Sequence, residues 1–118
     1  MNRKKIGNYG ELLAKNYLQK HRYKIIEQNW RCKIGEIDLI AKKGKSLIIV
    51  EVKATVIKKN FYPEDHITPK KLHRLKKLSE IYCIYKKPSV SSIQIDVIAI
   101  EFSKTYKPNY IKHYQNIV

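Results

Sequence analysis

Two apolar stretches that lie close together, Gly35–Ala41 and Leu47–Ala54, limit the possible folds more than any other feature of this chain. The basic turn Lys42-Lys43-Gly44-Lys45 separates them, so we expect two neighbouring strands of one sheet. Both alternating faces of the second stretch are almost wholly apolar, which is typical of a strand buried on both sides. The chain is therefore expected to build a covered sheet around these residues.

Charged side chains interrupt this apolar pattern at three positions. Asp38 lies in the first strand, whereas Glu51 and Lys53 share one face of the second because successive side chains alternate. Burying a carboxylate and an ammonium without partners costs on the order of several kcal/mol. A divalent cation and phosphate oxygens would compensate these charges, as in a metal-dependent nuclease. An internal ion pair between Asp38 and Lys53 is the alternative interpretation.

The nuclease interpretation assigns a role to each of these residues. Phosphodiester cleavage needs a nucleophilic water and neutralisation of the scissile phosphate, which Mg²⁺ held by two or three oxygens can supply. Asp38 and Glu51 are the candidate metal ligands, and the Val52 carbonyl is a further one. Lys53 is expected to orient or help deprotonate the attacking water.

Glu11 has two interpretations. It lies three and seven residues before Ala14 and Leu18, so it leans toward the apolar side of an amphipathic helix and is a candidate residue beside the metal. Asn8 and Glu11 also have the spacing of a capping box, in which Glu11 would only bond the backbone at the start of the helix.

The remaining periodicity predicts an α/β fold with the order helix, three strands, helix, strand and a final edge strand. A helix can cover each face of such a mixed sheet. Thr68 is expected to cap the second helix, with Pro69 in its first turn. The expected elements are a helix at Asn8–Arg22, strands at Tyr23–Trp30, Gly35–Ala41 and Leu47–Ala54, a loop at Thr55–Ile67, a helix from Pro69 to about Lys86, a strand at Ile93–Ile100 and an edge strand at Tyr110–Tyr114.

The net charge of +15 is spread through the chain, which favours a polyanionic partner. Nucleic acid is the first expectation, while a ribosome, an anionic membrane surface or a bias toward lysine would give the same charge. Lys70 and Lys71 oppose the helix dipole in the first turn of the second helix, which suggests phosphate binding nearby; a solvated basic face is the alternative. Asp96 is expected to form an ion pair, with Lys53 or Arg31 as its possible partner.

Length and composition favour a soluble, cytosolic protein without a membrane span. The 118 residues fit one domain with a single core. No apolar run approaches about 20 residues, and the first residues lack the apolar stretch of a signal peptide. Cys32 and Cys83 have no metal-ligand or disulfide spacing, so both are expected to be reduced.

Several short runs together resemble the YraN-like bacterial proteins over about nine-tenths of the chain. The runs are Gly10-Glu11-x-x-Ala14-x-x-Tyr17-Leu18, Asn29-Trp30-Arg31, Gly35-Glu36-Ile37-Asp38-Leu39-Ile40-Ala41, Glu51-Val52-Lys53, Thr68-Pro69-Lys70-Lys71 and Asp96-Val97-Ile98. The resemblance implies the restriction-endonuclease-like core of the PD-(D/E)xK superfamily, to which Holliday-junction resolvases also belong. It places the catalytic residues of that superfamily at Glu11, Asp38, Glu51 and Lys53.

The chain departs from the family pattern near this set. Ile37 stands before Asp38 in place of the proline of the superfamily name. Ala54-Thr55-Val56 follows Lys53 where family members usually have an arginine. The metal ligands are intact, so these departures bear on contacts with the substrate.

The sequence hypothesis is thus an endonuclease dependent on Mg²⁺ or Mn²⁺ that cuts DNA, with a branched or otherwise structured substrate as one option. Glu11 joins Asp38, Glu51 and Val52 as an expected metal ligand, and Arg31, Lys70 and Lys71 are the expected nucleic-acid contacts. The resolvase relatives suggest a homodimer. A nucleic-acid-binding module without turnover, and a basic structural or ribosome-associated protein, are the alternatives.

Overall fold

The computed structural model describes residues 1–118, and its elements follow the predicted order, with a short 3₁₀ helix added before the second long helix. The elements are α1 (Arg3–Lys20), β1 (Lys24–Cys32), β2 (Gly35–Lys43), β3 (Ser46–Val56), η1 (Pro63–His66), α2 (Pro69–Lys86), β4 (Ser92–Phe102) and β5 (Pro108–Tyr114). The strands form one five-stranded sheet in sequence order. Only β3 and β4 are parallel, because the chain crosses over through α2 between them.

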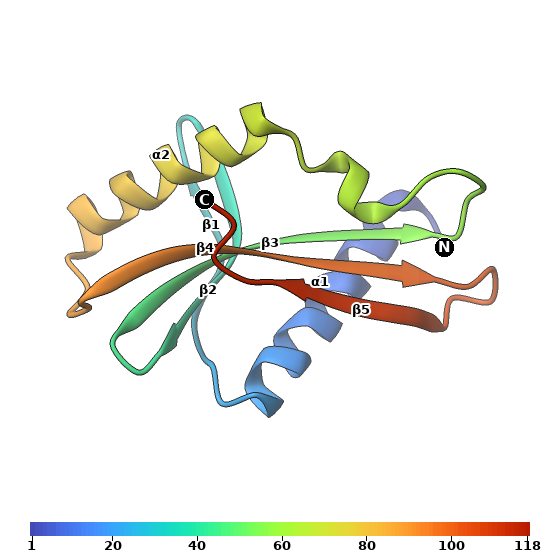
Figure 1. Ribbon diagram of the computed structural model, residues 1–118, viewed down its shortest axis with the longest axis horizontal. Coiled ribbons are helices and arrows are strands. Elements are labelled where there is room, and N and C mark those ends of the chain that lie inside the picture. Colours follow the sequence, from blue (N-terminus) through green and yellow to red (C-terminus); the bar gives the residue numbers. More distant parts are fainter.

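The two helices lie on opposite sides of this sheet (Figure 1). The predicted α/β arrangement, a mixed sheet with a helix over each face, is therefore confirmed. The arrangement is compatible with a nuclease-like fold. Neither helix is long and apolar enough to cross a membrane.

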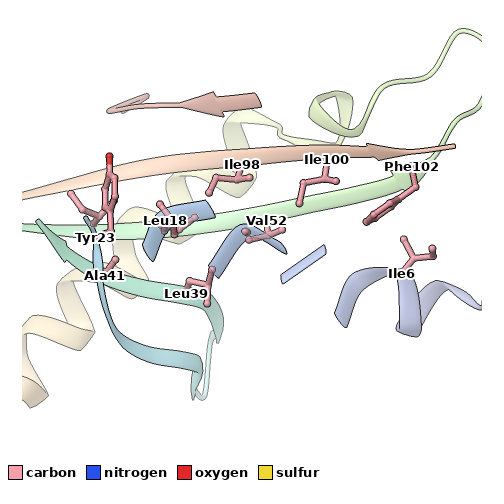
Figure 2. Close-up of a cluster of buried hydrophobic side chains, with 12 residues drawn as sticks. Ile6, Leu18, Tyr23, Leu39, Ala41, Val52, Ile98, Ile100 and Phe102 are labelled. Atoms are coloured by element: carbon pink, nitrogen blue, oxygen red, sulfur yellow. The ribbon is translucent and has the colours of Figure 1, made fainter. Parts of the chain in front are cut away.

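Each face of the sheet has its own buried cluster, and β3 contributes alternate residues to both. Val50 and Val52 belong to the cluster beneath α1, while Leu47 and Ile49 belong to the one beneath α2. The α1 cluster, drawn in Figure 2, is Ile6, Ala14, Leu18, Tyr23, Leu39, Ala41, Ile48, Val50, Val52, Ile98, Ile100 and Phe102. The α2 cluster is Ile37, Ile40, Leu47, Ile49, Leu75, Leu78, Tyr82 and Ile95.

The first helix begins earlier than predicted. Its N-cap is Asn2, whose side chain accepts a hydrogen bond from the Lys5 N–H at 2.9 Å, so the predicted cap at Asn8 is wrong. Three basic residues in the first turn hid this start in the sequence. Packing stabilises the turn, because Ile6 is buried in the α1 cluster and the Tyr9 ring stacks on Phe102 with centroids 5.0 Å apart.

The second helix begins and ends as predicted. The Thr68 hydroxyl accepts a hydrogen bond from the Lys71 N–H at 3.2 Å, and Pro69 occupies the first turn. Lys87 ends the helix in the left-handed conformation, with φ of 46°. The two ends of α2 are thus set by signals that the sequence contains.

The segment between β3 and α2 is more ordered than the loop predicted at Thr55–Ile67. Its first two residues extend β3, and Pro63–His66 forms η1. The phenolic O–H groups of Tyr110 and Tyr114 on β5 donate hydrogen bonds to Glu64 at 3.1 and 2.7 Å. The sheet therefore fixes η1 in place.

Asp96 has a different partner from those predicted. Its fully buried carboxylate lies 2.7 Å from Nε2 of His113 and also accepts the Asn116 N–H at 2.9 Å. Asp96 and Val50 are register partners on the α1 face, whereas Lys53 points to the other face. An ion pair with Lys53 or Arg31 is therefore wrong, although the expected structural role for Asp96 is supported. Cys32 and Cys83 are free thiols.

Candidate functional site

The site begins where β2 separates from β3. The two strands pair from Lys43 and Ser46 up to Leu39 and Val50, and beyond that point β2 pairs only with β1. The side chain of Asp38, the next residue of β2 toward the gap, accepts a hydrogen bond from the Val52 N–H at 2.8 Å. A carboxylate thus takes the place of the backbone partner that Val52 loses when the strands diverge.

This separation also orients the Val52 carbonyl. The N–H and C=O of one strand residue point to the same edge of the strand, since antiparallel partners exchange both bonds. The Val52 N–H points to the gap between the strands. Its carbonyl oxygen therefore faces the same gap, on the side where a metal bound to Asp38 would lie.

Glu51 and Lys53 approach the gap from β3, on the face covered by α2. Glu51 is buried, with 6 % of its surface exposed. Its Oε2 lies 3.3 Å from Nζ of Lys71, in the first turn of α2. Burial and the nearby Lys71 ammonium lower the pKa of Lys53 below its ordinary value, while the charges of Glu51 and Asp38 oppose this shift. The α2 N-terminus thus supplies a cation to a carboxylate that the strand buries.

Asp38 and Glu51 form a close carboxyl pair. Burial, a hydrogen bond between the two side chains and the charge of Glu51 raise the pKa of Asp38 to about 9, although the Val52 N–H opposes this. Two carboxyl groups in hydrogen-bonding contact need a shared proton or a cation between them. The pair therefore favours the binding of a proton or a cation.

Glu11 reaches the same cavity from α1, on the opposite face of the sheet. A Cβ on Gly10 would lie 2.5 Å from the Ala54 Cβ, so only glycine lets α1 pack this closely on β3. Burial raises the pKa of Glu11, and a hydrogen bond from Asn29 opposes that rise. Because Asn8 lies inside the helix, the capping-box interpretation of Glu11 is wrong.

These side chains line one cavity of about 1030 Å³ that opens where the strands separate. Side chains from both helices reach it although the helices cover opposite faces of the sheet. Its charged lining residues are Arg3, Glu11, Glu36, Asp38, Glu51, Lys53, Lys58, Lys71 and Arg74. A cluster of carboxylates is thus bordered by basic side chains, an arrangement suited to binding a phosphate beside a metal.

Four of the basic lining residues were not singled out from the sequence. Arg74 follows Lys71 by three residues on α2, so helical periodicity would have placed it beside Lys71. Arg3, Lys58 and His66 had no such signal, because only tertiary packing brings their segments to the cavity. Burial and the charges of Lys53, Lys71 and Arg3 lower the pKa of His66, so this imidazole is neutral at pH 7.

Two of the predicted nucleic-acid contacts lie outside the cavity. Lys70 is exposed on α2 beside the site, and it does not line the cavity as Lys71 does. Arg31 lies near the end of β1, where its Nε is 3.0 Å from Oε2 of Glu36 and 76 % of its side chain is exposed. The structure thus brings together Glu11, Asp38, Glu51, Lys53 and Lys71, but not Arg31 or Lys70.

The donor atoms at the gap fit a hard divalent cation. Asp38, Glu51 and the Val52 carbonyl offer only oxygen, which Mg²⁺ and Mn²⁺ prefer, and Mg²⁺ ordinarily keeps several waters. No group of three carboxylate, histidine or cysteine side chains lies at metal-ligand spacing anywhere in the chain. Glu11 lines the same cavity from α1, and its role as a further metal ligand stays a prediction.

Comparison with known proteins shows the family of this chain. Residues 10–100 match the model of the uncharacterised protein family UPF0102. The UPF0102 protein of Caldicellulosiruptor saccharolyticus is 38% identical over 100 residues, which is 85% of each chain. That of Dictyoglomus thermophilum is 37% identical over 107 residues, 91% of each chain. That of Leifsonia xyli is 34% identical over 113 residues, 96% of this chain and 95% of the relative.

Proposed function

The chain belongs to the UPF0102 family, the YraN-like family to which its sequence motifs pointed, and from this premise we propose that it is a metal-dependent endonuclease that hydrolyses phosphodiester bonds in DNA. The proposal includes the restriction-endonuclease-like core that the resemblance implies. A branched or otherwise structured DNA is the substrate we expect, by analogy with the resolvases of the same superfamily.

One observation carries the proposal. At the gap between β2 and β3, two carboxyl groups and the Val52 carbonyl lie beside Lys53. The cavity that holds them has a basic border. A structural ion pair would need only one carboxylate and one ammonium. Here two carboxyl groups, Asp38 and Glu51, interact in one buried gap, and their repulsion helps to raise the pKa of Asp38 although Lys71 offsets part of the charge of Glu51.

Each residue has a role in this proposal. Asp38, Glu51 and the Val52 carbonyl hold the metal, and a bound Mg²⁺ would supply charge neutralisation at the scissile phosphate. Lys53, whose pKa is lowered, orients the attacking water and accepts or shares its proton. Lys71 and Arg74 border the cavity on the α2 side, where they are placed to contact phosphate oxygens.

Calorimetric titration of Mn²⁺ tests the metal site directly. We expect binding by the wild type and no binding by the Asp38→Ala/Glu51→Ala variant, whereas Glu80→Gln, at an exposed acidic position of α2, keeps the wild-type affinity. Cleavage of linear, flapped and four-way DNA is then measured with Mg²⁺ and with Mn²⁺. Equal cleavage by the wild type and the double variant would refute the assignment of this site.

One contact favours the second candidate, a nucleic-acid-binding module without turnover. The Lys71 ammonium lies 3.3 Å from Glu51 and already supplies part of the charge that a metal would supply. Under this alternative, DNA binding is strong and salt-dependent but unchanged by chelation or by removal of the carboxylates. Measuring DNA affinity with and without EDTA, at two salt concentrations, separates the two functions.

A further inference from the structure

A second depression lies beside the end of α2, away from the carboxylates. It has a volume of about 710 Å³ and is lined by Trp30, Arg31, Cys32, Lys33, Ile34, Ile81, Tyr85 and Lys86. Three of these eight residues are basic and none is acidic. We call it the hairpin groove, because five of its residues come from the end of β1 and the turn into β2.

The floor of the hairpin groove is packed against the core and its rim is exposed. The Trp30 ring meets Tyr82 edge to face, with centroids 5.2 Å apart and planes at 90°. Tyr82 itself is buried in the α2 cluster. Tyr85, one turn away on the same helix, is 74 % exposed, and Ile34 at the turn is 44 % exposed. The Tyr85 ring is thus exposed to solvent beside the packed Trp30 and Tyr82 rings.

The hairpin groove and the carboxylate cavity lie along one side of α2. Lys71, Arg74 and Leu78 line the cavity, and Ile81 and Tyr85 line the groove. Their spacing of three or four residues places all five on one stripe of the helix. From Lys71 to Tyr85 is about 21 Å at 1.5 Å per residue, which equals the rise of roughly six base pairs of duplex DNA at 3.4 Å each.

The β1–β2 turn borders both depressions. Gly35 and Glu36 line the cavity, whereas the residues just before them line the groove. A Cβ placed on Gly35 would be 3.5 Å from Leu78 and 3.7 Å from Arg74, so the turn packs against the middle of α2. One polymer can therefore contact both sites only by following α2 past this turn.

We propose that the hairpin groove binds single-stranded DNA adjoining the cleavage site, with a base stacked on Tyr85 and the backbone held by Arg31, Lys33 and Lys86. Exposed aromatic rings between basic side chains are the usual means of holding an unpaired strand without reading its sequence. The inference rests on the proposed function, since it takes DNA as the substrate. It also gives Arg31, which lies outside the cavity, a contact with nucleic acid.

The exposed apolar side chains alone would equally suit a second copy of the chain. The charge of the groove argues against that occupant, because a symmetric contact would place two copies of Lys33 and Lys86 in one interface, where Glu36 offsets only Arg31. A polyanion removes this repulsion. Single-stranded DNA is thus the occupant that fits both the ring and the charges.

The test is fluorescence anisotropy in EDTA with labelled duplexes that are blunt or carry a 5′ or 3′ single-stranded tail. Tyr85→Ala should bind one tailed duplex about tenfold more weakly, the loss expected for removing a stacked base, and should bind the blunt duplex as the wild type does. Tyr85→Trp should restore tail binding. The matched control is Ile84→Ala, at a neighbouring position that is 69 % exposed but does not line the groove.

Each outcome decides between the proposals. If the wild type, Tyr85→Ala and Ile84→Ala bind the tailed duplexes equally well, the proposed role of the hairpin groove is overturned. The nuclease proposal is then left intact. Sedimentation that shows a wild-type dimer and a Tyr85→Ala monomer, with unchanged tail binding, would identify the groove as a self-association surface and also overturn the proposal. A wild type that binds none of the three duplexes would refute the proposed function together with the groove.

Discussion

Replacing Asp38 with asparagine is expected to stabilise the metal-free protein, and to do so more as the pH rises. The amide oxygen introduced by Asp38→Asn can accept the Val52 N–H as the aspartate does, and the amide nitrogen can donate to Glu51. Asparagine thus reproduces the protonated form of the aspartate. The substitution removes the need for a proton without removing either hydrogen bond.

The size of the stabilisation expected for Asp38→Asn follows from proton linkage. The ordinary pKa of an aspartate, 3.8, describes Asp38 in the unfolded chain, whereas burial and the contact with Glu51 raise the pKa in the folded chain to about 9. Between these two values the folded state binds one more proton than the unfolded state. The free energy of unfolding therefore falls by about 1.4 kcal/mol per pH unit as the pH rises. From pH 5 to pH 8 the advantage of Asp38→Asn should grow by about 4 kcal/mol.

Urea unfolding at pH 5, 6.5 and 8 in EDTA measures this difference. Asp38→Ala, which leaves the Val52 N–H without its acceptor, should lose part of the gain, and Glu80→Gln should follow the wild type. Added Mn²⁺ should stabilise the wild type at pH 8 and not the asparagine variant. A difference that is constant with pH would refute the shared proton. Destabilisation by about 3–5 kcal/mol at every pH would identify Asp38 as one half of an internal ion pair.

Three further substitutions test the positions of the helices and the pairing of buried charges. Gly10→Ala should destabilise the fold by about 1–3 kcal/mol in thermal melts, because its Cβ would lie 2.5 Å from β3. Its control is Gly7→Ala, whose Cβ would meet nothing within 4 Å and whose free energy of unfolding should rise by about 0.5–1 kcal/mol. An equal loss of stability in both variants would contradict the packing argument. His113→Ala should destabilise by about 1–3 kcal/mol, measured in urea, since it removes one hydrogen-bond partner of the buried Asp96 and leaves the Asn116 N–H and the Gln94 amide; no measurable loss would show that this contact is not needed. Lys71→Met should tighten Mn²⁺ binding, measured by calorimetry, at least about tenfold, or about 1.4 kcal/mol, because it frees the Glu51 carboxylate that Lys71 neutralises. Unchanged affinity would exclude competition between Lys71 and the metal.

Local patterns in the sequence predicted most of the secondary structure. Alternation along β3 and the Thr68-Pro69 start of α2 are confirmed, because each depends on residues within a few positions of one another. The early start of α1 was missed since its first turn is basic and is held by tertiary contacts of Ile6 and Tyr9. The pairing of Asp96 with His113 was missed for the same reason, as these residues meet only when β5 docks on β4.

The sequence by itself determined the chemical elements of the site: a carboxylate in one apolar strand, and a carboxylate and a lysine on one face of the next. Alternation in a strand is local, so it can be read directly. Only the tertiary structure decided that β2 separates from β3 at Asp38, and that Glu11 and Lys71 reach the same gap from helices on opposite faces. That arrangement depends on the packing of segments distant in sequence, and no local pattern of residues specifies it.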